Sequence, residues 1–279
     1  MTEKSPIPIG KFFTTRAGHQ IHYHEAGTSN ATKPSVLMLH GSGPGASGYS
    51  NFKGNFPFLA KHGYHVVIPD YIGYGLSSKP ADYQYRVENQ VPALRELLEH
   101  LGVRKVAIVG NSLGGWFALN HAINYPDEVA KLIVMAPGGL EPPEKFVPHM
   151  EGLRELFRIP RERDFSTQAM RHLFSLFMFE ARDVTDTVLA ERLEIARMQP
   201  PEVYSTMGGE VTTPRLKELK APVLALWGYH DKFVPYRHAQ YLLDNAPQVR
   251  LITSNRAGHW FMIEEPEIFN RECLAFLEE

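Results

Sequence analysis

The segment of residues 106–119 constrains the fold of this chain more than any other. Its first four residues are apolar without alternation, which is typical of a strand buried on both faces, and small and large apolar residues alternate from Leu113 onward, as in a buried helix. Between the two lies a Gly-x-Ser-x-Gly pentapeptide centred on Ser112. A strand that turns into a helix so abruptly holds the central serine in a strained conformation and needs small neighbours. The pattern predicts that the Ser112 hydroxyl projects from the sheet at a helix N-terminus, where developing negative charge is favoured.

A serine hydroxyl is a poor nucleophile near neutral pH, so the pentapeptide alone would indicate only a Ser-Gly loop that caps a helix. Catalysis needs a base within hydrogen-bond reach and a third group that orients the base. Asp231 follows a predicted strand at residues 223–227, and His259 follows another at residues 249–253. The chain order serine, acid, histidine is the one expected when the serine lies in such a turn. We interpret Ser112, Asp231 and His259 as a catalytic triad.

Strands and helices alternate along most of the chain. Apolar runs predict strands at residues 36–39, 64–69, 106–109, 130–135, 223–227 and 249–253, after an initial pair at 11–15 and 20–25. Helical patterns lie between them at residues 51–62, 87–101, 236–245 and 266–277, and after Leu113. This alternation predicts an α/β fold with a mostly parallel sheet and helices on both faces.

Residues 137–213 break the alternation. Prolines 137, 142, 143 and 148 interrupt regular structure at the start of this segment, and residues 150–207 show only helical patterns. Helices inserted between two strands of a sheet predict a lid over the carboxyl edge of that sheet. We therefore expect an α/β core of residues 1–136 and 214–279 that carries a helical cap of residues 137–213.

The composition favours a small-molecule partner. The 279 residues include 29 basic and 31 acidic ones, a net charge of -2, so there is no electrostatic case for nucleic acid or for an anionic membrane surface. The single cysteine, Cys273, allows neither a disulfide framework nor a cysteine-rich metal site and fits a reducing compartment. The first ten residues lack the apolar core of a signal peptide, and no stretch is long enough to span a membrane. We expect a cytoplasmic protein.

His22 and His24 alternate with Ile21 and Tyr23 on the predicted strand of residues 20–25, so both imidazoles lie on one face. Two histidines could share a metal ion, but no third ligand lies at a suggestive spacing. We interpret them as side chains on a solvated strand face and expect no metal site.

The loop of residues 40–46, His-Gly-Ser-Gly-Pro-Gly-Ala, admits two interpretations. It matches a Gly-x-Gly-x-x-Ala dinucleotide fingerprint, and Asp70 stands where a ribose-binding acid would follow. Against this, Pro44 lacks the N–H that a phosphate would need, and no helical pattern begins until about residue 51. A hydrolase needs an exposed backbone N–H near the nucleophile and space for substrate, which Ser42 and its flanking glycines, Gly41 and Gly43, can supply. We favour the hydrolase and keep dinucleotide binding as a distant alternative.

Arg192 lies inside the apolar arc of a predicted helix. At about 100° per residue its side chain shares a face with apolar neighbours; these are Val188, Leu189, Leu193, Ile195 and Ala196. A guanidinium on a buried face is costly unless it meets an anion, and its planar fork matches a carboxylate. The sequence leaves two partners open, a substrate carboxylate or an internal ion pair.

On these residues the chain resembles an α/β-hydrolase and, more narrowly, the meta-cleavage product hydrolases, which cleave carbon–carbon bonds in aromatic catabolism. The similarity rests on residues 40–46, Asn51, and segments 110–115, 136–140, 150–152 and 258–260. It covers nearly the whole chain and is weakest in the predicted cap. The chain departs from the family at Ala257, where a cysteine is usual, and at Tyr229-His230, which replaces a common Arg-acid pair.

The resemblance implies an oxyanion hole formed by the backbone N–H groups of Ser42 and Leu113, no cofactor, and a homodimer or higher homo-oligomer. It also implies a polar substrate site that contains Asn51, Asn111, Arg192 and Trp260. The apolar run of residues 172–179, in which Leu173 and Phe177 lie, suggests only that apolar or aromatic groups are accepted. The nature of the acyl group is left open.

For this family the resemblance implies a substrate of the 2-hydroxy-6-oxohexa-2,4-dienoate type, a vinylogous 1,5-diketo acid. The dienol is expected to be ketonised with His259 in proton transfer, after which Ser112 attacks the distal ketone and the acyl-enzyme is hydrolysed. The products are a 2-hydroxypenta-2,4-dienoate and a carboxylic acid. The serine turn alone would serve a carboxylesterase or lactonase equally well, and we keep that alternative, although an esterase for neutral esters has no need of a buried cation.

Overall fold

The computed structural model describes residues 9–30, 32–180 and 184–279. These residues form one eight-stranded sheet in the order β1-β2-β4-β3-β5-β6-β7-β8. The strands are β1 Lys11–Thr14, β2 Gln20–Ala26, β3 Ser35–Leu39, β4 Val66–Pro69, β5 Val106–Asn111, β6 Val129–Met135, β7 Val223–Gly228 and β8 Val249–Ser254. The pairings from β4 through β8 are parallel, and β1 and β2 add an antiparallel edge. This confirms the predicted mostly parallel sheet.

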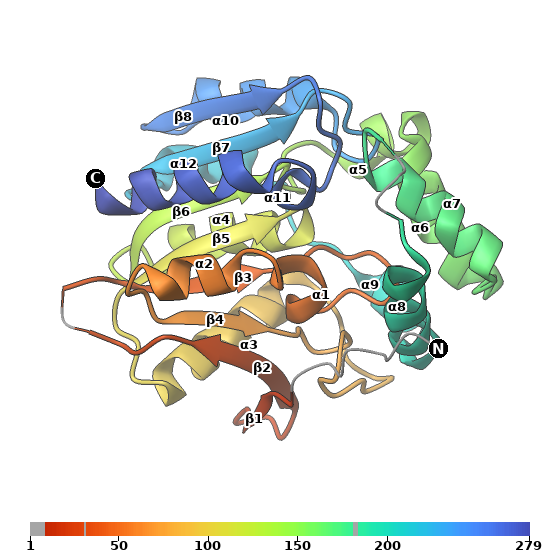
Figure 1. Ribbon diagram of the computed structural model, residues 1–279, viewed down its shortest axis with the longest axis horizontal. Coiled ribbons are helices and arrows are strands. Elements are labelled where there is room, and N and C mark those ends of the chain that lie inside the picture. The colour runs from red at the N-terminus through yellow and green to blue at the C-terminus, as the bar shows by residue number, and fades with distance from the viewer. Residues whose placement is uncertain (1–8, 31, 181–183) are drawn as a thin grey trace.

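Helices cover both faces of the sheet (Figure 1). Those of the α/β part are α1 Gly48–Phe52, α2 Phe56–Lys61, α3 Val87–His100, α4 Leu113–Asn124, α10 Ala239–Asn245, α11 Phe261–Glu264 and α12 Pro266–Glu278. In Figure 1, α2 and α12 lie in front of the sheet, and α3 and α10 lie behind it. The interior strands β3, β4, β5 and β7 are buried along their whole length because both of their faces are covered.

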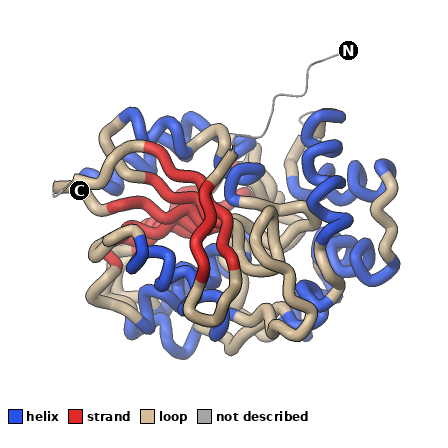
Figure 2. Tube along the Cα trace, turned by 90° about the horizontal axis from the view of Figure 1, so that it is seen from below, coloured by secondary structure: helices blue, strands red, loops and turns tan. Residues whose placement is uncertain are grey.

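The remaining helices lie together beyond the carboxyl ends of the parallel strands, on the right of Figures 1 and 2. They are α5 Pro143–Phe146, α6 Glu151–Glu162, α7 Thr167–Phe177, α8 Asp186–Met198 and α9 Glu202–Thr206. The described residues between β6 and β7 contain no strand apart from an isolated bridge between Arg86 and Gly208. The division into a core and a cap at residues 137 and 213 stays a prediction. Among the described residues, no helix has the length and apolarity to cross a membrane.

The helix predicted at residues 51–62 is two helices, α1 and α2, and the first begins earlier than expected. Ser47 caps α1 by accepting from the Ser50 N–H, and the Ser50 hydroxyl accepts from the Ser47 N–H in return. Pro57 lies in the first turn of α2, where a missing N–H leaves no backbone hydrogen bond unmade. Pro57 therefore fits the first turn of a second helix, whereas it would disrupt the interior of one longer helix.

The expectation that His22 and His24 lie on a solvated face is wrong, because both are buried. Strand β2 lies between β1 and β4, and α1 covers this face with Tyr49, whose ring lies 5.1 Å from that of His24. The His22 Nδ1 lies 2.8 Å from the Asp70 carboxylate. No group of three or more potential ligands for a metal ion occurs among the residues that the structure describes.

Asp70 joins β2, β4 and α1 rather than facing a ligand. Its carboxylate accepts from His22 and from the backbone N–H groups of Gly48 and Leu76. The His22 contacts lower the pKa of this carboxyl against the opposing effect of burial. With 1% of its surface exposed, Asp70 is not accessible to the ribose that the dinucleotide alternative requires.

The turn between β5 and α4 places Ser112 at φ 56° and ψ -113°. This is a conformation that residues with a side chain rarely adopt, so the surrounding contacts must hold it. A Cβ on Gly110 would lie 2.3 Å from the Gly114 carbonyl oxygen, and one on Gly114 would lie 2.2 Å from the Leu39 carbonyl oxygen. The helix can follow the strand this closely only because both positions are glycine.

We expect Gly114→Ala to lower the free energy of unfolding by about 1–3 kcal/mol, because the added methyl group meets backbone atoms that cannot move aside. Gly54→Ala is the matched control, since a Cβ at Gly54 has no neighbour within 4 Å. Denaturant unfolding of both variants measures the difference. Equal unfolding energies for Gly114→Ala and the parent chain would show that the turn has room to spare.

Candidate active site

His259 and Asp231 form a buried pair at the carboxyl ends of β8 and β7. The Nδ1 of His259 lies 2.7 Å from Oδ2 of Asp231. The other carboxylate oxygen accepts from the N–H groups of Phe233 and Val234 at 2.7 and 2.9 Å. A carboxylate held by two amides keeps the proton on Nδ1 and leaves Nε2 with a free lone pair. The pair can therefore act as an oriented base.

The loop that carries His259 lies against the serine turn. Asn111, the residue before Ser112, donates from its side chain to the His259 carbonyl oxygen at 3.2 Å. The described chain shows no direct hydrogen bond between the side chains of Ser112 and His259. The structure thus brings the three predicted triad residues to one edge of the sheet, two of them already paired.

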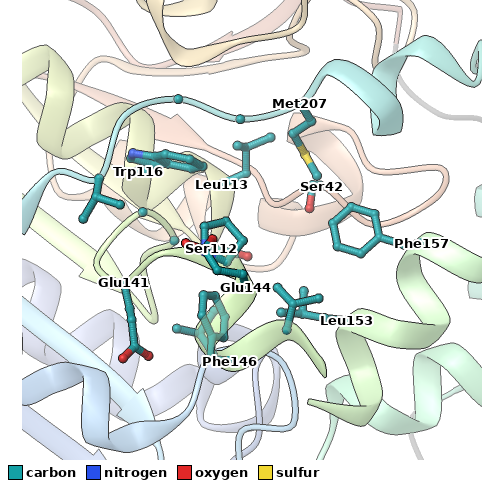
Figure 3. A pocket seen from close by; sticks show the side chains of 18 of the residues that line it. Ser42, Ser112, Leu113, Trp116, Glu141, Glu144, Phe146, Leu153, Phe157 and Met207 are labelled. Carbon is teal, nitrogen blue, oxygen red and sulfur yellow. The ribbon is translucent and has the colours of Figure 1, made fainter. Parts of the chain in front are cut away.

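Ser112, Ser42 and Leu113 line a common cavity of about 520 Å³, shown in Figure 3. The loop before Ser42 runs close beside the nucleophile, since a Cβ on Gly41 would lie 3.5 Å from the Ser112 Cβ. The N-terminus of α4 begins at Leu113 and adds a positive dipole end at the same place. Ser42 and Leu113 therefore lie at the same cavity as Ser112, and the oxyanion hole formed by their backbone N–H groups stays a prediction.

A buried pair of rings supports the Ser42 loop. His40 stacks on Tyr71 with ring centroids 3.9 Å apart, and its Nδ1 lies 2.7 Å from the Gly41 carbonyl oxygen. The Tyr71 hydroxyl donates to the His40 carbonyl oxygen at 2.7 Å. Burial lowers the pKa of His40 to about 4, so the ring is neutral near pH 7. Sequence reasoning did not find the role of Tyr71, because only the fold brings the two rings together.

Arg192 is buried in α8 without a carboxylate partner among the described residues. One terminal nitrogen donates to the side-chain oxygen of Asn51 at 3.1 Å, and the guanidinium lies 4.8 Å above the Trp260 ring. The neighbouring Glu191 pairs with Lys53 at 2.9 Å instead. Burial lowers the pKa of Arg192 to about 10, which leaves it charged at neutral pH. Of the two partners that the sequence left open, the internal ion pair is not found in the described chain.

Several buried polar atoms near Arg192 and Ser112 lack a hydrogen-bond partner. They include the Nε of Arg192, the side-chain nitrogen of Asn51 and the side-chain oxygen of Asn111. Buried polar groups are nearly always paired, so atoms left unpaired at one place mark a site that a ligand can complete. Asn51, Arg192 and Trp260 line a second cavity of about 290 Å³.

Phe177, which was expected near the substrate, lines neither cavity but packs against residues beside both. Its ring stacks on Phe233 at 3.9 Å and on Trp260 at 4.3 Å, and a Cβ on Gly43 would lie 3.1 Å from its edge. Val234, next to Phe233, lines the Ser112 cavity, while Trp260 lines the Arg192 cavity. Leu173, which was expected near the substrate, is fully buried and lines neither cavity.

The wall of the Ser112 cavity is mostly apolar and comes from segments that sequence reasoning did not identify. Its large apolar side chains are Trp116, Phe146, Leu153, Phe157, Met207, Val211 and Val234. Leu153 and Phe157 share one face of α6, four residues apart. The sequence predicted only helical structure for residues 150–207, and the tertiary structure shows that this face of α6 lines the same cavity as Ser112.

Comparison with known proteins places these features in a family. A family model described as "alpha/beta hydrolase fold" matches residues 34–266. A 2-hydroxy-6-oxo-6-phenylhexa-2,4-dienoate hydrolase of Burkholderia cepacia is 36% identical and the alignment covers 99% of each chain. A 2-hydroxy-6-oxononadienedioate/2-hydroxy-6-oxononatrienedioate hydrolase of Comamonas testosteroni is 33% identical with the same coverage.

Comparison with solved structures gives the same family. A meta-cleavage product hydrolase of Pseudomonas fluorescens superposes with a TM-score of 0.83 at 29% identity, covering 97% of this chain and 98% of that one. An esterase of Exiguobacterium antarcticum superposes with a TM-score of 0.81 at 19% identity, over 97% of this chain and 100% of that one. The second similarity shows the shared fold alone.

We expect Arg192→Met to keep or raise the melting temperature, because a buried charge without an ionic partner is replaced by an apolar chain of similar length. Arg95→Met is the comparison, since Arg95 donates to both Glu128 oxygens and should lose about 0.5–1 kcal/mol. Thermal unfolding near pH 7 measures both. A larger loss for Arg192→Met than for Arg95→Met would identify Arg192 as part of the structural framework.

Proposed function

The chain belongs to the α/β-hydrolase family and, within it, to the meta-cleavage product hydrolases, and from this premise we propose that it hydrolyses the carbon–carbon bond of a 2-hydroxy-6-oxohexa-2,4-dienoate that carries a neutral apolar group at carbon 6. The observation that carries the proposal is the buried, carboxylate-free Arg192 among unpaired polar atoms, close to a serine and histidine site. A dienoate supplies the anion that this site lacks.

In the proposed complex the substrate carboxylate binds Arg192, with Asn51 beside it and the Trp260 ring against the planar dienoate. A guanidinium and a carboxylate form paired, charge-assisted hydrogen bonds, which are stronger than neutral ones and fix the orientation of the ligand. The far ketone then reaches Ser112. Ser112 and Arg192 line different cavities, so a substrate that contacts both groups must extend from one cavity to the other.

The proposed reaction begins with proton transfer, because a carbon leaving group departs only if its electron pair is stabilised. The proton of the 2-hydroxyl moves to carbon 5 with His259 assisting, which gives the keto form. Ser112 then attacks carbon 6 and passes its proton to His259, while Asp231 holds the imidazolium. The N–H groups of Ser42 and Leu113 stabilise the oxyanion. The bond between carbons 5 and 6 breaks towards a dienolate, and water hydrolyses the acyl-enzyme.

The lining of the Ser112 cavity supports a neutral acyl group. Its basic residue, Arg86, pairs with Glu88 at 3.2 Å, and it also has two acidic residues, Glu141 and Glu144. The carboxylate of Glu141 points away from Ser112 towards His238, at 2.8 Å (Figure 3). The two relatives reported above differ in the acyl group of the substrate for which they are named: one is named for a phenyl substrate and the other for a dioate. In the Ser112 cavity, the second carboxylate of a dioate substrate would meet mostly apolar side chains and no unpaired cation, which disfavours its binding.

A small-ester hydrolase is the second candidate. Arg192 lines the second cavity and not the Ser112 cavity, so a short neutral ester could fill the Ser112 cavity without contacting the cation. We also retain as proposals the cytoplasmic location, the homodimer or higher homo-oligomer and the absence of a cofactor that the sequence led us to expect. The lone, buried Cys273 supports the first of these.

We predict that Ser112→Ala folds normally and loses nearly all turnover, by several orders of magnitude, because it removes the proposed nucleophile. The exposed Ser205→Ala is the control and should match the parent enzyme. Steady-state rates and thermal unfolding of both variants test this. A Ser112→Ala rate near that of the parent enzyme would remove the serine mechanism, and titration with a dinucleotide would then test the other interpretation of residues 41–46.

We predict that the enzyme, without added metal or cofactor, bleaches the coloured dienolate of 6-phenyl or 6-alkyl substrates and turns over the corresponding dioate at least about tenfold less efficiently. Arg192→Met should lower kcat/KM for the dienoate by about 10- to 100-fold, since a charge-assisted hydrogen bond is lost, and leave a neutral aryl ester nearly unchanged. Brisk ester turnover with no bleaching of any dienoate would establish the esterase instead. Faster turnover of the dioate would overturn the neutral acyl pocket alone.

A further inference from the structure

The end of helix α7 lies directly on the loop that carries His259. The Phe177 carbonyl oxygen accepts from the N–H groups of both His259 and Trp260, at 2.7 and 3.3 Å. A Cβ on Gly258 would lie 2.8 Å from that same carbonyl oxygen. Residues 177–179 and 257–260 are therefore in backbone contact, although about 80 residues separate them in the chain. Any movement of the α7 end is transmitted to the histidine loop.

Glu264, at the end of the short helix α11, joins these two segments. One of its carboxylate oxygens accepts from the Phe179 N–H, and the other accepts from the Gly258 N–H at 2.7 Å. The first amide belongs to the segment after α7, and the second belongs to the residue before His259. A single carboxylate thus bridges the helical layer and the histidine loop.

We propose that Glu264 is a positioning residue for His259, and that its ionised carboxylate holds the histidine loop against the end of α7 in the geometry that turnover needs. This inference rests on the proposed function, in which His259 transfers protons. Glu264 does not contact the reacting atoms and acts only through Gly258 and Phe179.

The bridge requires the ionised form. A carboxylate accepts hydrogen bonds on both oxygens, whereas a carboxylic acid carries a proton that needs an acceptor of its own. Both partners of Glu264 are amide donors, so protonation leaves its new O–H without an acceptor in the bridge. The loop contact therefore weakens when Glu264 takes up a proton.

The surroundings of Glu264 place its protonation near neutral pH. Burial raises the pKa of this carboxyl to about 7 against the lowering effect of the two amides. The negative charge of Asp231 raises the pKa further, and His259 lowers it. His230 faces the same region by stacking on Phe179 at 4.7 Å, while the adjacent Glu265 is bound to the Ser254 hydroxyl. Among the described residues, no Lys or Arg side chain forms a salt bridge with Glu264.

The direction of the pH effect follows from the raised pKa. Above about pH 8 the carboxylate is ionised and the bridge is complete, and below about pH 6 the protonated form predominates. The contribution of the bridge to turnover is therefore present on the alkaline side and lost as the pH falls through about 7. If Glu264 only stabilised the fold, its replacement would leave the pH dependence of kcat/KM unchanged.

Glu264→Gln tests the proposal because glutamine keeps the shape of the protonated acid. Its carbonyl oxygen can accept from one amide, and its NH₂ group then faces the other donor. We expect the ratio of parent to variant kcat/KM to be about 10- to 100-fold near pH 8.5 and to approach one near pH 5.5.

The substrate is the one that the parent enzyme is found to cleave, dienoate or aryl ester, and the exposed Glu267→Gln is the matched control with a ratio near one at every pH. A ratio that is the same at all pH values would overturn the positioning role, even if it is large. Absence of activity in the parent enzyme would instead contradict the proposed function.

Hydrogen exchange of the parent enzyme tests the bridge without activity and without a variant. After correction for intrinsic exchange rates, peptides that contain the Phe179 and Gly258 amides should lose protection as the pH falls from about 8 to about 6. Both amides lower the pKa of Glu264, so its protonation favours local openings that release these amides while the side chain stays buried. Peptides from β5 are the internal reference and should keep their protection from exchange over the same pH range. Unchanged protection of both amides across this range would overturn the proposal, whether or not Glu264→Gln folds.

Discussion

The backbone contact between β5 and α4 is the constraint on which the rest of the structure depends. Two glycines let the helix begin within one residue of the strand, and this closeness holds Ser112 in a conformation that a free chain would leave. The strain is sustained by the surrounding parallel sheet, whose interior strands are buried on both faces. A rigid sheet is thus the reason that one serine can be presented at its carboxyl edge in a strained conformation.

Burial of an unpaired cation is the second constraint, and it acts against stability. Among the residues that the structure describes, the guanidinium of Arg192 has the Asn51 oxygen and two aromatic faces as partners. Removing a charge from water without a counter-ion is unfavourable by several kcal/mol, and natural proteins keep such groups where function requires them. The side-chain nitrogen of Asn51, at the same cavity, also lacks a partner. These unpaired groups support the proposal that a substrate carboxylate binds there.

Aromatic packing connects the helical layer to the sheet. The Phe233, Phe177 and Trp260 rings form one stack, and each comes from a different part of the chain. The same place holds the backbone contacts of the Phe177 carbonyl oxygen with the histidine loop. Because the ring and the carbonyl belong to one residue, the aromatic stack and the backbone contacts of His259 depend on the same helix end.

The sequence by itself determined the α/β fold, the serine turn, the Asp231 and His259 partners and the buried face of Arg192. Each of these depends on local patterns, namely apolar runs, glycine spacing and helical periodicity, and their chain order. Only the tertiary structure decided that His22 and His24 are buried with Asp70, that Phe177 stacks between Phe233 and Trp260, and that Glu264 bridges two distant amides. These are contacts between segments far apart in the chain, and a local pattern carries no information about which surfaces will meet.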